Sequence, residues 1–125
     1  MKTNPNVNLI NGVKIILFQL GNLKKSESLC IISDTNTKNL GELFENVSRK
    51  MKVKTTHKII KPLTNHGQNL PIGLEETMKN SELTVALTNT SIAHSPQRIR
   101  VGLSGKRFLS LPDYSFNLLK HPAIK

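Results

Sequence analysis

One segment decides the fold, and it reads Ser28-Leu29-Cys30-Ile31-Ile32-Ser33-Asp34. It is a short, continuously apolar run that ends in an acid. Such a run is typical of a strand buried on both faces, as in a parallel sheet covered by helices. The polar residues 34–37 that close it are of the kind that cap a helix N-terminus. The segment therefore predicts a buried strand followed by a helix.

The flanking sequence alternates between helical and extended patterns. An apolar stripe at helical period covers residues 9–20 and is closed by Gly21, a common helix-ending residue. Further helices are expected after the capping residues 34–37 as far as Met51, from Pro71, from Pro96 to Gly105, and as a last turn at 116–119. Further strands are expected over residues 53–61, 82–87 and 107–111.

Strands that alternate with helices imply right-handed crossovers and a parallel sheet. We therefore expect an α/β fold, a Rossmann-like three-layer sandwich with a short, mostly parallel sheet of about four strands in the order 2-1-3-4. The chain has 125 residues, which is enough for one domain. In this interpretation residues 1–22 form an N-terminal amphipathic helix and residues 23–125 the βαβ core.

The chain is strongly basic, with 18 Lys and Arg against 8 acids and a net charge of +10. That charge could attract nucleic acid, anionic lipid or an acidic ligand. However, arginine is scarce, aromatic residues make up 4% and tryptophan is absent, so groups that clamp phosphates or stack on bases are few. We interpret most of the charge as a solvated surface and disfavour nucleic acid as a partner. A local basic patch, either a docking surface or a solvated face, comprises Arg98, Arg100, Lys106 and Arg107.

No apolar run approaches the ~20 residues that a membrane-spanning helix needs. The Met1 end lacks the pattern of a secretory leader. We therefore expect a cytoplasmic protein with no membrane partner. The single cysteine, Cys30, cannot form an internal disulfide or a cysteine-based metal cage.

The expected strand order creates a candidate ligand crevice. The first and third strands would be neighbours whose connections leave in opposite directions, and open α/β sheets bind ligands at such a point. Free backbone N–H groups at these polar strand ends favour a small anion. Asp34 could instead cap the next helix, and a histidine there could hold the local loop. The candidate crevice residues are Asp34, Thr88, Thr90, Ser91 and His94.

Motifs for chemistry are missing from the sequence. No glycine occurs in residues 33–37, which excludes a dinucleotide fingerprint at that turn, and residues 102–106 lack the spacing of a phosphate loop. Cys30 lies in an apolar strand and is expected to pack as a small hydrophobic residue. Ser33 has no nucleophile elbow, and His57, in a strand, is interpreted as structural or surface-exposed. We predict no catalytic residue, no metal ligand and no cofactor in this chain.

Several pieces of the chain follow one another in a recognisable order. They are residues 23–34 after an amphipathic helix, His66-Gly67 with Leu70-Pro71, residues 78–82, Thr88-Asn89-Thr90-Ser91-Ile92-Ala93-His94-Ser95, and residues 105–112. This order resembles the N-terminal domain of the thermophilic-type metallo-aminopeptidases, the leucyl aminopeptidase family that includes aminopeptidases T and S. The resemblance covers about residues 6–122. It departs from the family at Glu82, where aspartate is common, and after Met51, where no glycine follows.

The resemblance implies a non-catalytic scaffold or substrate-side domain of an aminopeptidase-like protein. In that family the two-metal site is built from Glu, His and Asp side chains of a later C-terminal domain, and this chain ends at Lys125, before it. A divalent metal is therefore expected only in that absent domain. The expected partners are the missing domain or a second copy of the chain.

Three questions stay open at this point. A related branch of the superfamily contains ring-cleaving dioxygenases, so the chemistry of the parent protein is not determined. The chain could also be a stand-alone, Rossmann-like module that binds a small anion, or a basic protein that binds nucleic acid.

Overall fold

A computed structural model describes residues 5–24, 26–65, 68–88, 92–93 and 95–111 of the chain. The N-terminal helix α1 (Pro5–Lys14) continues into the π-helix η1 (Ile15–Leu20). The remaining elements alternate between strands and helices. In chain order they are β1 (Ser28–Asp34), α2 (Lys38–Lys50), β2 (Lys54–Ile60), α3 (Leu74–Lys79), β3 (Leu83–Ala86), α4 (Pro96–Leu103) and β4 (Arg107–Ser110).

The four described strands form one parallel sheet in the order β2-β1-β3-β4. Strand β1 lies at its centre, where Ile31 faces His57 of β2 on one side and Val85 of β3 on the other. The predicted fold class and strand order are confirmed.

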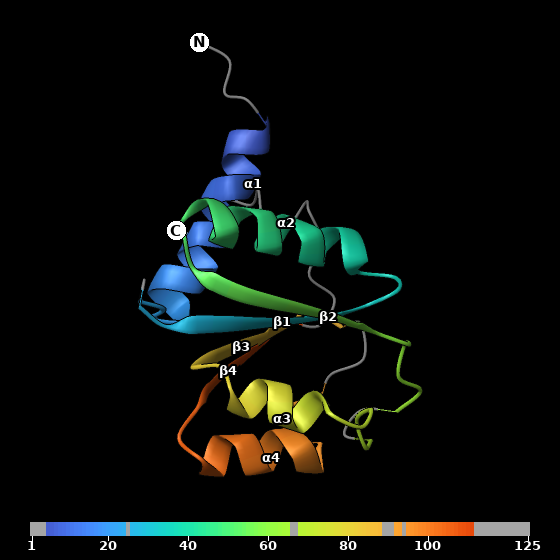
Figure 1. Cartoon of the computed structure of the whole chain (residues 1–125). Coiled ribbons are helices and arrows are strands. Elements are labelled where there is room, and N and C mark those ends of the chain that lie inside the picture. Colours follow the sequence, from blue (N-terminus) through green and yellow to red (C-terminus); the bar gives the residue numbers. More distant parts are fainter. Residues whose placement is uncertain (1–4, 25, 66–67, 89–91, 94, 112–125) are drawn as a thin grey trace.

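Helices cover both faces of this sheet. Figure 1 shows α1 and α2 on one face and α3 and α4 on the other. The side chains of β1 alternate between the two layers: Leu29 and Ile31 belong to the core under α2, and Cys30 and Ile32 to the core over α3 and α4. Every β1 residue except Ser28 is buried. This burial on both sides is the physical reason for the continuous apolar run in the sequence.

The N-terminal helix ends in a wide turn of π geometry. The Gly21 N–H donates to Ile16 O (2.8 Å), and the Leu23 N–H donates to Leu17 O (3.0 Å). Gly21 ends the helix as expected, but it does so with φ −83°, and the left-handed conformation falls on Asn22, with φ 51°. Glycine is required at position 21 for another reason. A Cβ there would lie 2.7 Å from Leu83 Cδ2, so η1 approaches the sheet too closely for any side chain.

The start of one helix differs from the sequence-based expectation. Helix α3 begins at Leu74 and not at Pro71, because the preceding Gly73 adopts φ 90°, which interrupts helical geometry. After α2, where this chain has no glycine, Lys52 adopts the left-handed φ of 62°. The expected turn at 116–119 lies outside the described residues.

The start of α4 agrees with the expectation in detail. Ser95 is the N-cap, its Oγ accepts a hydrogen bond from the Arg98 N–H (3.2 Å), and Pro96 is the first helical residue.

Among the described helices, none combines the length and apolar character needed to cross a bilayer.

Candidate functional site

The predicted crevice lies where β1 and β3 end side by side. The structure describes two of its five candidate residues, Asp34 and Thr88, and both are buried. Thr90, Ser91 and His94 lie outside the described residues. The Asp34 carboxylate accepts hydrogen bonds from the N–H groups of Asn36 (2.8 Å) and Thr37 (2.9 Å) and from the Thr37 hydroxyl. The carboxylate thus holds the turn into α2, and its negative charge disfavours an anion beside it.

A second group of polar residues was not foreseen. Ser33 at the end of β1, His57 in β2 and Glu45 on α2 form a hydrogen-bonded chain. The distances are 2.7 Å from Ser33 Oγ to His57 Nε2 and 3.1 Å from His57 Nδ1 to Glu45 Oε1. This order of hydroxyl, imidazole and carboxylate is that of a serine hydrolase triad.

Access to this chain of groups is closed by α2. Ser33 is fully buried, and the His57 side chain is 5% exposed. Gly41 of α2 lies directly over both: a Cβ at this position would lie 2.9 Å from Ser33 Oγ, 2.7 Å from His57 Cε1 and closer still to Nε2. A nucleophile needs a reacting carbon about 3–3.5 Å away, and the backbone of α2 occupies that space. The Ser33–His57–Glu45 chain therefore joins α2 to the sheet and does not form an open active site.

The Glu45 carboxylate is held in its ionised form. Burial of Glu45 works against its charge, but hydrogen bonds from Arg49 Nε (3.0 Å) and His57 together hold its pKa below the ordinary value. With Glu45 ionised, His57 Nδ1 is the donor, and in a neutral ring Nε2 accepts from the Ser33 hydroxyl. The signal available in the sequence was that Ser33, His57 and Glu45 are polar although they occur in elements that were expected to pack together. The contact itself depends on the pairing of β1 with β2.

The Cys30 thiol is inert. Cys30 is fully buried in β1, and burial raises the pKa of its thiol to about 12, although the Thr84 hydroxyl acts in the opposite direction. A neutral, enclosed thiol packs as a small hydrophobic group, as the sequence predicted. Among the described residues, no group of three or more His, Cys, Asp or Glu side chains is arranged to hold a metal ion.

The predicted basic patch divides into two pairs, and the first pair is neutralised. Arg100 of α4 binds Glu75 of α3 through Nη2 (2.6 Å) and Nε (3.0 Å). Together with a second contact from Lys79, this pairing lowers the pKa of Glu75 to about 2. Arg107 of β4 binds Glu27, whose pKa it holds below the ordinary value.

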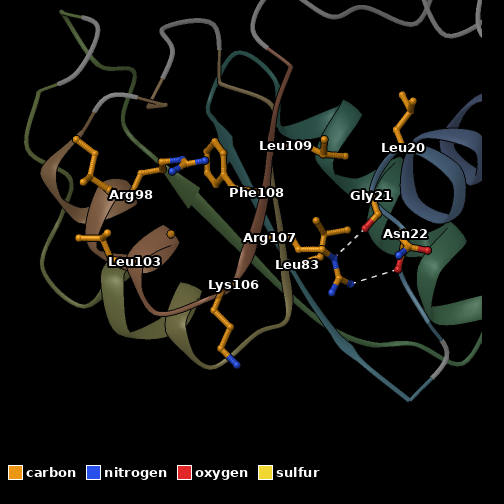
Figure 2. Close-up of a pocket in the computed structure, with 12 residues that line it drawn as sticks. Leu20, Gly21, Asn22, Leu83, Arg98, Leu103, Lys106, Arg107, Phe108 and Leu109 are labelled. Carbon is orange, nitrogen blue, oxygen red and sulfur yellow. Dashed lines mark hydrogen bonds between the residues drawn. The ribbon is translucent and has the colours of Figure 1, made fainter.

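Arg107 has a second task besides its ion pair. It donates to the carbonyl oxygens of Gly21 (3.1 Å) and Asn22 (3.3 Å), as Figure 2 shows. Arg107 thereby ties the start of β4 to the end of η1.

The second pair of patch residues, Arg98 and Lys106, lines a cavity of about 590 Å³ beside β4. Figure 2 shows this cavity between η1, α4 and β4, with the Arg98 guanidinium beside the Phe108 ring. The Arg98 Cζ lies 4.7 Å from the centroid of that ring. The cavity lies at the edge of the described sheet and towards its amino-terminal end, so it is distinct from the predicted crevice.

No protein-family model and no curated protein matches the chain. Among solved structures, the fold is similar to that of wild-type AmpT from Thermus thermophilus, with a TM-score of 0.59 and 9% sequence identity. The match covers 90% of this chain and 37% of AmpT, so the chain spans little more than a third of that protein. At this identity the likeness concerns the fold alone.

Proposed function

We propose that this chain provides a non-catalytic scaffold or substrate-side domain of an aminopeptidase-like protein. One observation carries the proposal: the described fold corresponds to part of AmpT, an aminopeptidase, over 90% of this chain but only 37% of AmpT. The order of sequence pieces that resembles the N-terminal domain of that family supports the same conclusion independently of the coordinates.

The state of the reactive side chains supports a structural role. Ser33 lies under the backbone of α2, where no substrate carbon can reach it. Cys30 is enclosed between the layers with a raised thiol pKa. Neither Ser33 nor Cys30 is therefore placed to act as a nucleophile.

The amino ends of the strands are held rigidly, as a scaffold requires. The Glu82 carboxylate accepts from the Ser28 N–H (2.7 Å) and from the Ser28 hydroxyl (2.6 Å), which ties the start of β3 to that of β1. These hydrogen bonds lower the pKa of Glu82 to about 2. The Arg107 contacts do the same for β4 and η1. A fixed sheet of this kind can position loops or a neighbouring domain.

The test is an activity measurement on the purified chain. With leucine p-nitroanilide and added Zn²⁺ or Co²⁺, we expect no turnover above a metal-only blank. Metal-dependent turnover that follows the protein through purification would refute the proposal. A second assay addresses the buried serine: with p-nitrophenyl acetate, Ser33→Ala and the unaltered chain should give the same rate. A loss of esterase activity on that substitution would assign catalysis to the Ser33–His57–Glu45 chain.

A further inference from the structure

Two of the cations that line the cavity beside β4, Arg98 and Lys106, form no ion pair with another described residue. In contrast, Arg100 and Arg107 each form one. Lys106 acts through space on Glu82 and contributes to the low pKa of that carboxyl. Two positive charges therefore face this cavity without a bound carboxylate.

The Arg98 guanidinium lies between the Phe108 ring and Gly102. It stacks on Phe108, and Gly102 leaves the room for it, since a Cβ there would lie 2.8 Å from Nη1. Its Nε is buried and has no hydrogen-bond partner among the described residues. A guanidinium stacked by its face keeps its edge available for a carboxylate.

Part of the cavity wall is apolar and exposed, beside the polar part that the charged residues form. Leu20 is 60% exposed, Ile99 48% and Leu103 84%, and all three line the cavity. They are three of the five large apolar side chains that are exposed in the described part of the chain. Apolar groups gathered at one place mark contact sites for other molecules.

We propose that this cavity binds an acidic, aliphatic segment of another polypeptide. Its carboxylates would pair with Arg98 and Lys106, and its aliphatic side chains would cover Leu20, Ile99 and Leu103. This inference goes beyond the scaffold role and does not depend on it, because it rests on the cavity alone.

Other occupants fit the cavity less well. Nucleic acid would not cover the three aliphatic side chains with apolar groups of its own. The Phe108 face that could stack on a base is covered by Arg98. A second copy of this chain would bring a net charge of +10 against an equal charge. An inorganic anion would leave the apolar wall in water.

The chain contains no tryptophan, so a tryptophan-labelled peptide reports its own binding by fluorescence. Three peptides are compared at low salt: one alternating Leu with Asp and Glu, one alternating Leu with Lys, and one alternating Ser with Asp and Glu. The acidic, aliphatic peptide should bind at least about tenfold more tightly than either of the others, since it alone satisfies both halves of the site.

Substitutions locate the site. Arg98→Gln, Lys106→Gln and Leu103→Ser should each weaken binding by about fivefold or more. Lys38→Gln is the matched control, because Lys38 is exposed at the start of α2 on the other face of the sheet and its loss changes the charge equally. Arg98→Lys keeps the charge but not the planar group, and it should bind as weakly as Arg98→Gln. Circular dichroism confirms that each variant is folded.

Three results would overturn this inference. One is equal binding of the acidic and basic peptides. Another is a loss in Lys38→Gln as large as in Lys106→Gln, which would mean general attraction by the net charge. The third is that the chain binds a single-stranded oligonucleotide, or a second copy of itself, more tightly than the acidic, aliphatic peptide, and that the cavity substitutions abolish this binding. None of them involves turnover, so this outcome and that of the activity assay are distinguishable.

Discussion

Substitution of Gly41 by alanine probes the contact between α2 and the sheet. In an exposed helix this change stabilises by about 1 kcal/mol, since glycine is a poor helix former. Here the new methyl group would lie 2.7 Å from His57 Cε1 and 2.9 Å from Ser33 Oγ, both in side chains that cannot move into solvent. Overpacking of this kind costs about 2 kcal/mol, and disrupting the buried hydrogen bond between Ser33 and His57 costs about 2 kcal/mol more.

The net expectation is a loss of about 3 kcal/mol in the free energy of unfolding. For a chain of this size that loss lowers the melting temperature by about 10 °C. Urea unfolding followed by circular dichroism measures the free energy, and a thermal scan measures the temperature. A Gly41→Ala chain that is as stable as the unaltered one would refute the close contact and, with it, the conclusion that Ser33 is inaccessible.

Gly102 offers a matched control in another helix. A Cβ at Gly102 would meet the far end of the Arg98 side chain, which can move aside, so Gly102→Ala should be neutral or stabilising by up to about 1 kcal/mol. A double substitution separates crowding from helix propensity. In a His57→Ala background the imidazole is gone, and the loss from Gly41→Ala should shrink by more than about 1 kcal/mol. Equal losses in both backgrounds would place the cause elsewhere.

Three further predictions use other parts of the fold. Because the pKa of Glu82 falls from 4.5 to about 2 on folding, its contribution to stability is present above pH 5 and is lost as the pH falls towards 2. In Glu82→Gln, the free energy of unfolding in urea should therefore decrease less steeply with falling pH. An unchanged decrease would contradict this. The Cys30 thiol should react with a thiol reagent at pH 8 only after unfolding, so rapid labelling of the native chain would be contrary. Lys52→Gly relieves a left-handed residue and should stabilise by about 0.5–1 kcal/mol in the same unfolding assay.

The layered architecture could be predicted because it depends on local patterns. Strand β1 is apolar at successive positions because helices cover both sheet faces, and this pattern is visible in one short segment. The alternation of strands and helices predicted a parallel sheet, and the order 2-1-3-4, one of those it allows, is the order observed. The Ser95 cap followed from the preference of serine before proline at a helix start. Where the chain conformation is local but unusual, the prediction failed. Gly73 delays α3, and η1 closes with π geometry.

The candidate sites were predicted less well, because each requires contacts between distant parts of the chain. Of the crevice residues, Asp34 is a polar strand end as expected, but its hydrogen bonds to the following turn appear only in three dimensions. The basic patch looked uniform in sequence. Folding pairs Arg100 with Glu75, which is 25 positions away, and Arg107 with Glu27, which is 80 positions away, while Arg98 is left beside an aromatic ring.

The amino-acid sequence by itself determined the class of this protein, a basic α/β chain with a mostly parallel sheet, because hydrophobic periodicity is imposed residue by residue along each element. Only the tertiary structure decided what the polar side chains do. Ser33, His57 and Glu45 become one buried chain, and Arg98 and Lys106 one cavity, because the register of the strands and the packing of helices bring them together. Such contacts leave no periodic trace in the sequence, since one side chain from each of several elements is enough to make them.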